Sequence, residues 1–386
     1  MRIWQIVQKD PFRLFFPLGA VLALVGVAPW AMQLFENASY PREFHRIFMI
    51  DGFLLAFVCG FLMTAIPRFT ASFPAEKVEV LGVLTGLAGT AIAAFLLPPW
   101  APFLFSALVV LVLMEFAARR FAKRTSNPPY TFIFIGVGIA FWLAANVVQS
   151  LYFMGINVPV EIVGIANELF TNGAIMSLIL GVGGRLIPGI LGWQEIVSQQ
   201  RKQYEKNEPF IGLVPLEIWA AIGLFAASFL LQPLLPLVLC LLIRGGVTAF
   251  IAFKYWRIHQ FPKTRSFLTW SIWASCWCLT LGYFLPALWP GGAAHAMHLL
   301  FVAGFSLLTL LISTRVSFAH SSRGTDDEKS ARGILIFAGV LLLAMVTRVT
   351  ASLWPKIYFH HLGYAATLWI LGLAIWAYTI IVRKSS

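Results

Sequence analysis

The chain has 386 residues, of which 59% are hydrophobic and 11% are charged, and its formal net charge is +12. This composition, with a mean hydropathy of +0.82, excludes an ordinary soluble globular protein. The basic residues are spread over many connections instead of forming one patch, which argues against a nucleic-acid-binding protein.

About twelve apolar runs follow one another along the chain, each close to the ~20 residues that an α-helix needs to cross a bilayer. Runs of this length satisfy their backbone hydrogen bonds as helices rather than as barrel strands. We therefore predict an all-α polytopic membrane protein that forms a single transmembrane domain over residues 1–386. The expected spans are 14–34, 44–66, 78–97, 101–121, 130–153, 160–184, 210–231, 234–255, 266–288, 293–314, 332–353 and 359–382.

The basic residues predict the orientation of these spans. Connections rich in Lys and Arg, such as those around Lys77, Arg119 and Lys254, alternate with connections that contain almost none. By the positive-inside rule, both termini are expected in the cytoplasm, and 185–209 is expected to be the longest cytoplasmic loop. Met1–Arg13 contains no short apolar segment with a cleavage site, so we expect no removable signal peptide.

The second, tenth and twelfth predicted spans have histidines near their starts, at His45, His295, His298, His360 and His361. The predicted topology places all of these starts at the outer face and places His259 and His320 in cytoplasmic loops. Imidazole is well suited to ligate haem iron or copper. A lone interfacial histidine more commonly forms a hydrogen bond, but several at one depth favour a site. His295 and His298 are three residues apart and share a helix face.

Other polar residues also lie inside the predicted spans. Arg348 is placed to meet a haem propionate, although an arginine near a helix end also snorkels to the interface. Asp51, Glu168, Asn172 and Arg244 could instead line the midplane site of a secondary transporter, which is the main alternative function. The four cysteines lie inside spans, and no Cys-x-x-Cys-His motif indicates a covalently attached haem.

Four motifs resemble the NnrS family. They are the segments 10–16 (DPFRLFF), 60–67 (GFLMTAIP), 183–188 (GGRLIP) and the stretch from His298 to 313–323 (STRVSFAHSSR). Their order and spacing cover most of the chain. The resemblance implies a twelve-helix bacterial inner-membrane protein that contains haem and copper and is linked to nitric oxide metabolism and nitrosative stress.

The resemblance also implies functional residues. His45 matches the first histidine of the family pattern Trp-His-x-His-Glu-Met, but Ile47 and Phe48 replace the second histidine and the glutamate. The loss at position 47 removes a potential copper ligand, for which His295 or His361 could substitute. His298 matches the family histidine that opens the tenth span, and His320 matches a histidine after the span.

The resulting hypothesis is a haem b protein with one or two haems. His45 and His298 are the expected axial ligands, bridging the second and tenth spans, with His295 and His361 next in rank. Quinol from the outer leaflet and a gas such as NO are the expected partners, besides membrane lipid, and an oxidoreductase activity is one option. A chaperone or structural subunit of a redox complex is a further alternative.

Haem–copper oxidases offer a more distant similarity, because they also have twelve helices and haem-ligating histidines on the second and tenth. They add copper ligands on the sixth and seventh helices. The corresponding spans, 160–184 and 210–231, contain no histidine here. An oxidase-type binuclear centre is therefore not expected, and a shared fold would not transfer the reaction.

Overall fold

The computed structural model describes all residues except 1–2, 36–39, 199–209, 321–330 and 386, and the described residues contain helices but no strand. Eleven helices are long and apolar enough to cross a membrane. This confirms the prediction of an all-α polytopic membrane protein. These helices run over Phe12–Leu34, Arg42–Phe69, Lys77–Leu96, Ala101–Ala122, Tyr130–Phe153, Val160–Leu191, Leu237–Trp256, Phe267–Leu288, Pro290–Ala319, Arg332–Leu353 and Pro355–Ile381.

The remaining predicted span, 210–231, corresponds to a shorter apolar helix, α12 (Leu216–Leu230). Its 15 residues fall short of the ~20 that a perpendicular crossing requires. All twelve predicted spans thus have a helical counterpart. The number of crossings and the cytoplasmic position of both termini remain predictions.

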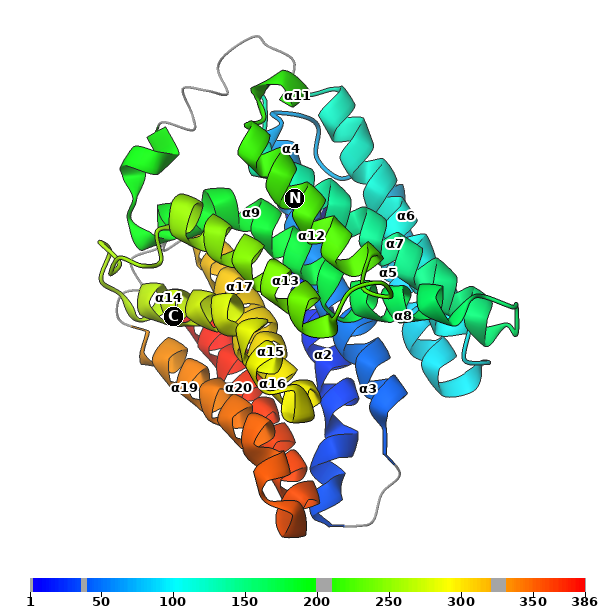
Figure 1. The fold of residues 1–386 in the computed structure, drawn as a ribbon. Helices are drawn as coiled ribbons and strands as arrows, with labels where there is room; N and C mark the ends of the chain where they lie inside the picture. The colour runs from blue at the N-terminus through cyan, green and yellow to red at the C-terminus, as the bar shows by residue number, and fades with distance from the viewer. Residues whose placement is uncertain (1–2, 36–39, 199–209, 321–330, 386) are drawn as a thin grey trace. The chain divides into compact units, whose positions relative to one another are not determined.

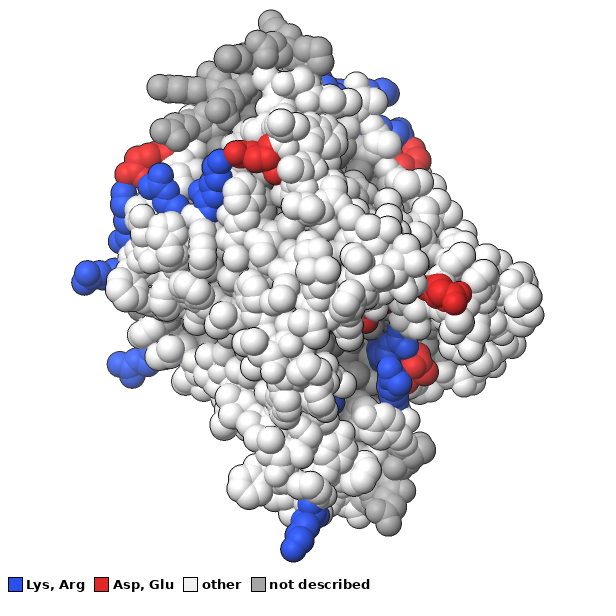
Figure 2. All heavy atoms as spheres, in the orientation of Figure 1, with Lys and Arg blue, Asp and Glu red and all other residues white. Residues whose placement is uncertain are grey.

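Large apolar side chains are exposed on these helices, including Phe95 at 62%, Leu343 at 53% and Leu371 at 48%. Most of the face shown in Figure 2 carries uncharged side chains, and Lys, Arg, Asp and Glu occupy few places on it. Surfaces of this kind are unfavourable in water but suit contact with lipid.

The chain divides into two compact units. The first contains Met1–Gly26, Arg42–Arg185 and Val197–Leu234, and the second contains Val27–Pro41, Leu186–Ile196 and Leu235–Ser386. The first spanning helix, Phe12–Leu34, therefore contributes to both units. The single domain expected over residues 1–386 remains a prediction.

In the first unit, α5 (Lys77–Leu96) packs on α6 (Ala101–Ala122), which in turn packs on α7 (Ile133–Phe153). Figure 1 shows these three helices side by side. Glu76 and Glu79 form a capping box that starts α5, satisfying backbone N–H groups that have no partner inside the helix. Gly86 lies close to Val109 of α6, because a residue without a side chain lets helices approach closely in a membrane protein.

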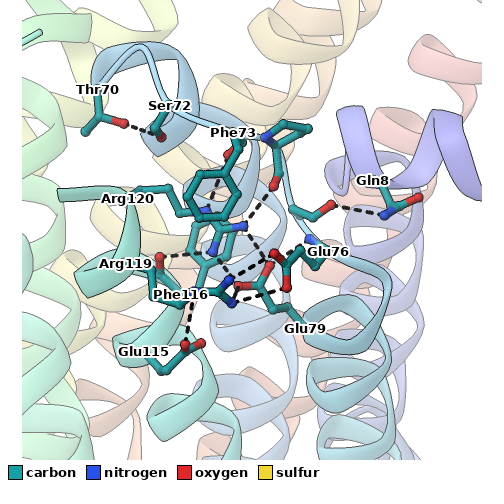
Figure 3. A network of polar contacts seen from close by, with 12 residues as sticks. Gln8, Thr70, Ser72, Phe73, Glu76, Glu79, Glu115, Phe116, Arg119 and Arg120 are labelled. Atoms are coloured by element: carbon teal, nitrogen blue, oxygen red, sulfur yellow. Dashed lines mark hydrogen bonds and ion pairs between the residues drawn. The ribbon is translucent and has the colours of Figure 1, made fainter. Parts of the chain in front are cut away.

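A buried ion pair joins α5 to α6 at the start of α5 (Figure 3). Arg120 is fully buried and pairs with both carboxylate oxygens of Glu79. Its guanidinium also donates to the backbone oxygens of Phe73, Pro74 and Phe116, so the connection before α5 is fastened to α6. A fully hydrogen-bonded pair of this kind compensates much of the desolvation that burial of two charges requires.

Arg119 extends this network toward the surface. It donates to Glu76 at 2.9 Å and to Glu79 at 3.3 Å, and it pairs with Glu115 at 3.4 Å. The hydrogen bond from Arg119 lowers the pKa of the exposed Glu76 carboxyl. The contribution of Glu76 to stability is therefore complete above the ordinary glutamate range and is lost as the pH falls through the lowered folded-state value.

In the second unit, α19 (Arg332–Thr350) and α20 (Tyr358–Ser385) form an extensive helix pair. The long helix Pro290–Ala319 packs between α14 (Phe267–Leu281) and α19. Small residues permit these contacts: Gly304 lies against Leu279 of α14, and Gly372 of α20 lies against Leu341 of α19.

Three of the spanning helices contain a π-helical segment in their N-terminal halves. The segments are η2 (Phe48–Leu54), η4 (Leu169–Gly173) and η7 (Leu299–Ser306). They interrupt Arg42–Phe69, Val160–Leu191 and Pro290–Ala319, which are the longest spans, with 28, 32 and 30 residues. Each follows a polar or histidine residue within three positions: His45, Glu168 and His298. Such segments are frequent at functional sites.

The predicted loop 185–209 was wrong at its start. Helix α9 (Ala174–Leu191) continues through Pro188 and ends before Gly192, whose φ of +90° is readily adopted only by glycine. Lys263 and Thr264 then donate their backbone N–H groups to the Leu191 oxygen. Residues 194–198 of the predicted loop are also helical, and 199–209 lie outside the described residues.

Candidate functional site

His45 lies in α3 (Arg42–Ile47), the first turns of the second spanning helix, in the first unit. Its Nδ1 is 2.9 Å from the backbone oxygen of Gly26. A carbonyl oxygen can only accept, so Nδ1 carries the proton and the neutral ring has its lone pair on Nε2. Metal-ligating histidines have this arrangement, in which the second nitrogen donates to a carbonyl or carboxylate and fixes the ring.

His298 ends α16 (Ala293–His298) in the second unit, directly before η7. Its Nδ1 is 2.9 Å from the backbone oxygen of Ala294, one helical turn earlier. The same reasoning places the proton on Nδ1 and the lone pair on Nε2. The ring also meets Phe301 edge-on, with ring centroids 5.5 Å apart. His45 and His298 therefore share the tautomer that suits a ligand of haem iron.

His295 has the opposite arrangement. Arg348, at the end of α19, donates from Nη1 to His295 Nδ1 across 2.6 Å. A guanidinium has no acceptor, so Nδ1 holds the lone pair and the neutral His295 ring carries its proton on Nε2. Tyr358 lies beside the ring, with centroids 5.7 Å apart. As long as Arg348 donates to it, His295 does not present Nε2 to a metal.

His361 lies in α20, also in the second unit, and its buried Nδ1 has no hydrogen-bond partner. The ring stands 6.4 Å from that of Tyr364. An unpartnered buried nitrogen is unfavourable, so this ring fits an additional polar or metal-containing group. His360, by contrast, is exposed.

The structure thus brings together His295, Arg348 and Tyr358 in the second unit, while His45 belongs to the first. The two histidines predicted to lie in loops are not part of this group. His259 is exposed, and His320 follows the C-terminal end of α17 (Leu307–Ala319). The Nδ1 of His320 also bonds to a backbone oxygen, that of Val316 at 2.7 Å, so His320 has the same tautomer as His45 and His298 and differs from them in its position after a helix end.

Among the described residues, no group of three or more His, Cys, Asp or Glu side chains could hold a metal ion. A haem does not need such a group, because the porphyrin supplies four ligands and the protein adds one or two. The tautomers of His45 and His298 therefore fit a haem.

A second polar cluster lies deeper in the first unit, around Asp51 of η2. Its Oδ1 accepts from Trp142 Nε1 at 2.8 Å and from Asn146 Nδ2 at 3.3 Å, both on α7. All three side chains are buried, Asp51 and Asn146 completely. Sequence reasoning identified Asp51 but missed Trp142 and Asn146. The polar Asn146 and Gln149, three positions apart in an apolar run, were the available signal.

Between this cluster and the surface, Asn167 Oδ1 accepts from Arg46 Nη2 at 2.8 Å and from Gln149 Nε2 at 2.7 Å. Arg46 also pairs with Glu43 at 2.8 Å. Of the remaining residues in the predicted transport site, Glu168 accepts from Asn172 at 3.2 Å in the first unit. Arg244 is fully buried in α13 (Leu237–Ile251) of the second unit.

A comparison with protein families agrees with the sequence motifs. The family model described as NnrS protein matches residues 6–382 of the chain. The chain belongs to the NnrS family. The match includes all of the described spanning helices, so this NnrS chain is a multi-pass membrane protein along nearly its whole length. NnrS membership fits a role in the response to nitric oxide. No curated protein matches the chain.

Proposed function

We propose that this NnrS protein binds haem b in a bacterial inner membrane and takes part in nitric oxide metabolism. His45 and His298 are the proposed axial ligands. The observation that supports them is a hydrogen bond from Nδ1 to a backbone oxygen, at 2.9 Å in both, in rings near the starts of spanning helices, a position that His320 does not share. The hydrogen bond fixes each ring and directs the ligating lone pair to Nε2.

The other residues take supporting roles in this proposal. Arg348 would bind a haem propionate, since a guanidinium and a carboxylate form a strong charge-assisted pair. His361 is the next candidate ligand, because its Nδ1 is buried without a partner. Bound haem would supply one-electron transfer, or NO binding if an axial position is open. Quinol is the proposed electron donor, approaching from the outer leaflet. A copper ion remains a weaker proposal, given Ile47 in place of a family histidine.

The visible spectrum of the purified protein tests this proposal. We expect a Soret band in the wild type and its loss or displacement in His45→Ala and His298→Ala. His259→Ala and His320→Ala are matched controls that should leave the band unchanged. A haem assay per chain in the four variants separates loss of haem from a change of ligand. A colourless wild-type protein that remains folded would overturn the proposal.

Secondary transport is an alternative, favoured by the buried polar residues Asp51 and Asn172 and the half-buried Glu168 of the first unit. Buried polar groups in spanning helices commonly mark substrate or ion pathways. Under this alternative the protein folds without haem, and substitutions of His45 and His298 do not alter its activity in vesicles. Under the haem proposal, the same substitutions abolish activity.

A further inference from the structure

The first unit contains a buried carboxyl group that none of the proposed haem chemistry uses. Asp51 is the tenth residue of the span Arg42–Phe69, about 14 Å along the helix from its start at 1.5 Å per residue. Its side chain is fully buried, and it has no ion pair within the described residues. A lone carboxylate at this depth is strongly disfavoured.

Hydrogen bonding at the two carboxyl oxygens is unequal. Oδ1 accepts from Trp142 Nε1 and Asn146 Nδ2, whereas Oδ2 has no partner. The amide oxygen of Asn146 also has none. Two buried acceptors are thus left without a donor in one small cluster. A single proton on Oδ2 would turn that oxygen into a donor and give Asn146 Oδ1 a potential partner.

Within the first unit, the buried polar atoms without a partner are grouped in one region. Among the described residues of the first unit, three buried side-chain polar atoms lack a partner: Asp51 Oδ2, Asn146 Oδ1 and Arg46 Nε. Asp51 and Asn146 bond to each other, and Arg46 lies on the same spanning helix as Asp51 and pairs with Glu43. Native structures satisfy nearly all such atoms, and two of the three, Asp51 Oδ2 and Asn146 Oδ1, are acceptors that lie on residues already joined by a hydrogen bond.

The surroundings of Asp51 contain one charged group. Trp142 and Asn146 of α7 are neutral, as is Ser106 of α6, which faces the carboxyl. Arg46, on the same spanning helix, is the charge that acts on Asp51, and it is itself paired with Glu43. Glu168, on α8 (Val160–Glu168), accepts a hydrogen bond from Asn172 Nδ2 through Oε2. Among the described residues, Asp51 belongs to no group of three or more His, Cys, Asp or Glu side chains that could hold a metal ion, so the cluster lacks the several oxygen ligands of a protein cation site.

We propose that Asp51 is a proton-binding site, neutral at pH 7, with its proton on Oδ2 and its Oδ1 as the carbonyl oxygen that accepts from Trp142 and Asn146. The Glu43–Arg46–Asn167–Gln149 contacts form the polar end of the site nearest the helix start. The proposal does not depend on haem, so its test is independent of the test of the proposed function.

Infrared spectroscopy of the whole protein in a detergent without ester groups tests the proposal. We expect a C=O stretching band of a protonated carboxyl at pH 7, which moves to lower frequency in D₂O and is missing in Asp51→Asn. An ordinary aspartate, with a pKa near ~3.9, would be ionised at pH 7. Asp10→Asn is the matched control: Asp10 is also buried but pairs with Arg13 and Arg68, so its replacement should leave the band unchanged.

A second variant tests the position of the proton and serves if Asp51→Asn fails to fold. In Trp142→Phe the Oδ1 carbonyl loses one donor, so the band should persist and move to higher frequency. Absence of the band in the wild type at pH 7, or its retention in Asp51→Asn, would overturn the proposal. So would its loss when sodium chloride replaces choline chloride at constant pH, because the site would then take a metal cation.

Discussion

The ring nitrogen that carries the proton distinguishes the candidate histidine ligands better than their positions in the sequence do. His45, His295 and His298 all lie near helix starts, yet a carbonyl fixes the proton on Nδ1 in two of them and Arg348 excludes it from Nδ1 in the third. The partner of one ring nitrogen determines what the other can do. Sequence position alone ranks these three histidines nearly equally.

Arg348 is predicted to affect haem affinity rather than iron ligation. If it binds a propionate, Arg348→Gln should lower haem occupancy by roughly tenfold or more, because a charge-assisted hydrogen bond is lost. The Soret position should not move. Titration of the haem-depleted protein with hemin measures this effect, and Arg348→Lys, which keeps the charge, should retain part of the affinity. Unchanged affinity in Arg348→Gln would contradict the propionate role.

Arg120 is predicted to be a strong determinant of stability. Arg120→Met leaves Glu79 buried with a weaker partner and removes donors from three backbone oxygens, so it should cost about 3–5 kcal/mol of unfolding free energy. Thermal or denaturant unfolding in detergent measures the loss. The neighbouring Arg119→Met is the control: Arg119 is partly exposed, and such pairs contribute about 1 kcal/mol or less. Equal losses in the two variants would show that burial is not the cause.

The sequence identifies which polar residues lie inside the spans, but not which residues of other helices they bond to. Asp51 and Trp142 are 91 positions apart, and Glu79 and Arg120 are 41 apart. Nothing in an isolated apolar run specifies which neighbouring helix its polar residues will face. Conversely, the placement of His45, His298 and His361 near helix starts was predictable, because apolar run length alone locates the ends of a spanning helix.

At the scale of the helix, local irregularity was not predictable. The segments η2, η4 and η7 each contain one glycine and at least one polar residue, but regular helical stretches of this chain contain such residues too, for example Gly86 and Thr90 in α5, so these residues do not identify a π-helical segment. A π-helical turn adds a residue to the helix and so rotates the residues after it relative to those before it. In Arg42–Phe69, this rotation separates His45, before η2, from Asp51 inside it. Tertiary packing, rather than local preference, decides where such a turn is retained.

Two glycines of α7 should respond in opposite ways to replacement by alanine. A Cβ at Gly138 would lie 2.8 Å from the backbone oxygen of Ala174, whereas one at Gly136 would meet nothing within 4 Å. Gly138→Ala should therefore destabilise the protein by about 1–3 kcal/mol. Gly136→Ala should be neutral or stabilise it by up to about 1 kcal/mol, since alanine favours the helix. Unfolding midpoints of the two variants compare them, and a loss for Gly136→Ala as large as that for Gly138→Ala would refute this packing argument.

For the whole molecule, the apolar runs and the alternation of basic connections both predict twelve crossings. The described residues contain eleven helices long enough to cross and the shorter helix α12. Whether the chain crosses eleven or twelve times therefore depends on whether α12 (Leu216–Leu230) spans the membrane. The class of protein and the order of its helices were predictable, since composition and run length determine both. The division into two compact units was not, because it depends on contacts between distant segments.

Reporter fusions determine whether α12 crosses. If it does, a fluorescent reporter that matures only in the cytoplasm should be active at the C-terminus, and a phosphatase active only outside should work after Gln232. If α12 does not cross, fusions after Gln232 report the cytoplasm and the C-terminus lies outside. Fusions after Ala122 are the internal control, because they precede α12 and should be cytoplasmic under both outcomes.

The shortness of α12 has a consequence for the lipid around it. Fifteen residues at 1.5 Å each cover about 22 Å, against ~30 Å of hydrocarbon in a typical bilayer. Such hydrophobic mismatch is relieved when the bilayer thins beside the helix or when flanking side chains extend to the headgroups. Acyl-chain length thus becomes a variable for this protein: shorter-chain lipids should favour the membrane-crossing state of α12, and thicker bilayers should disfavour it.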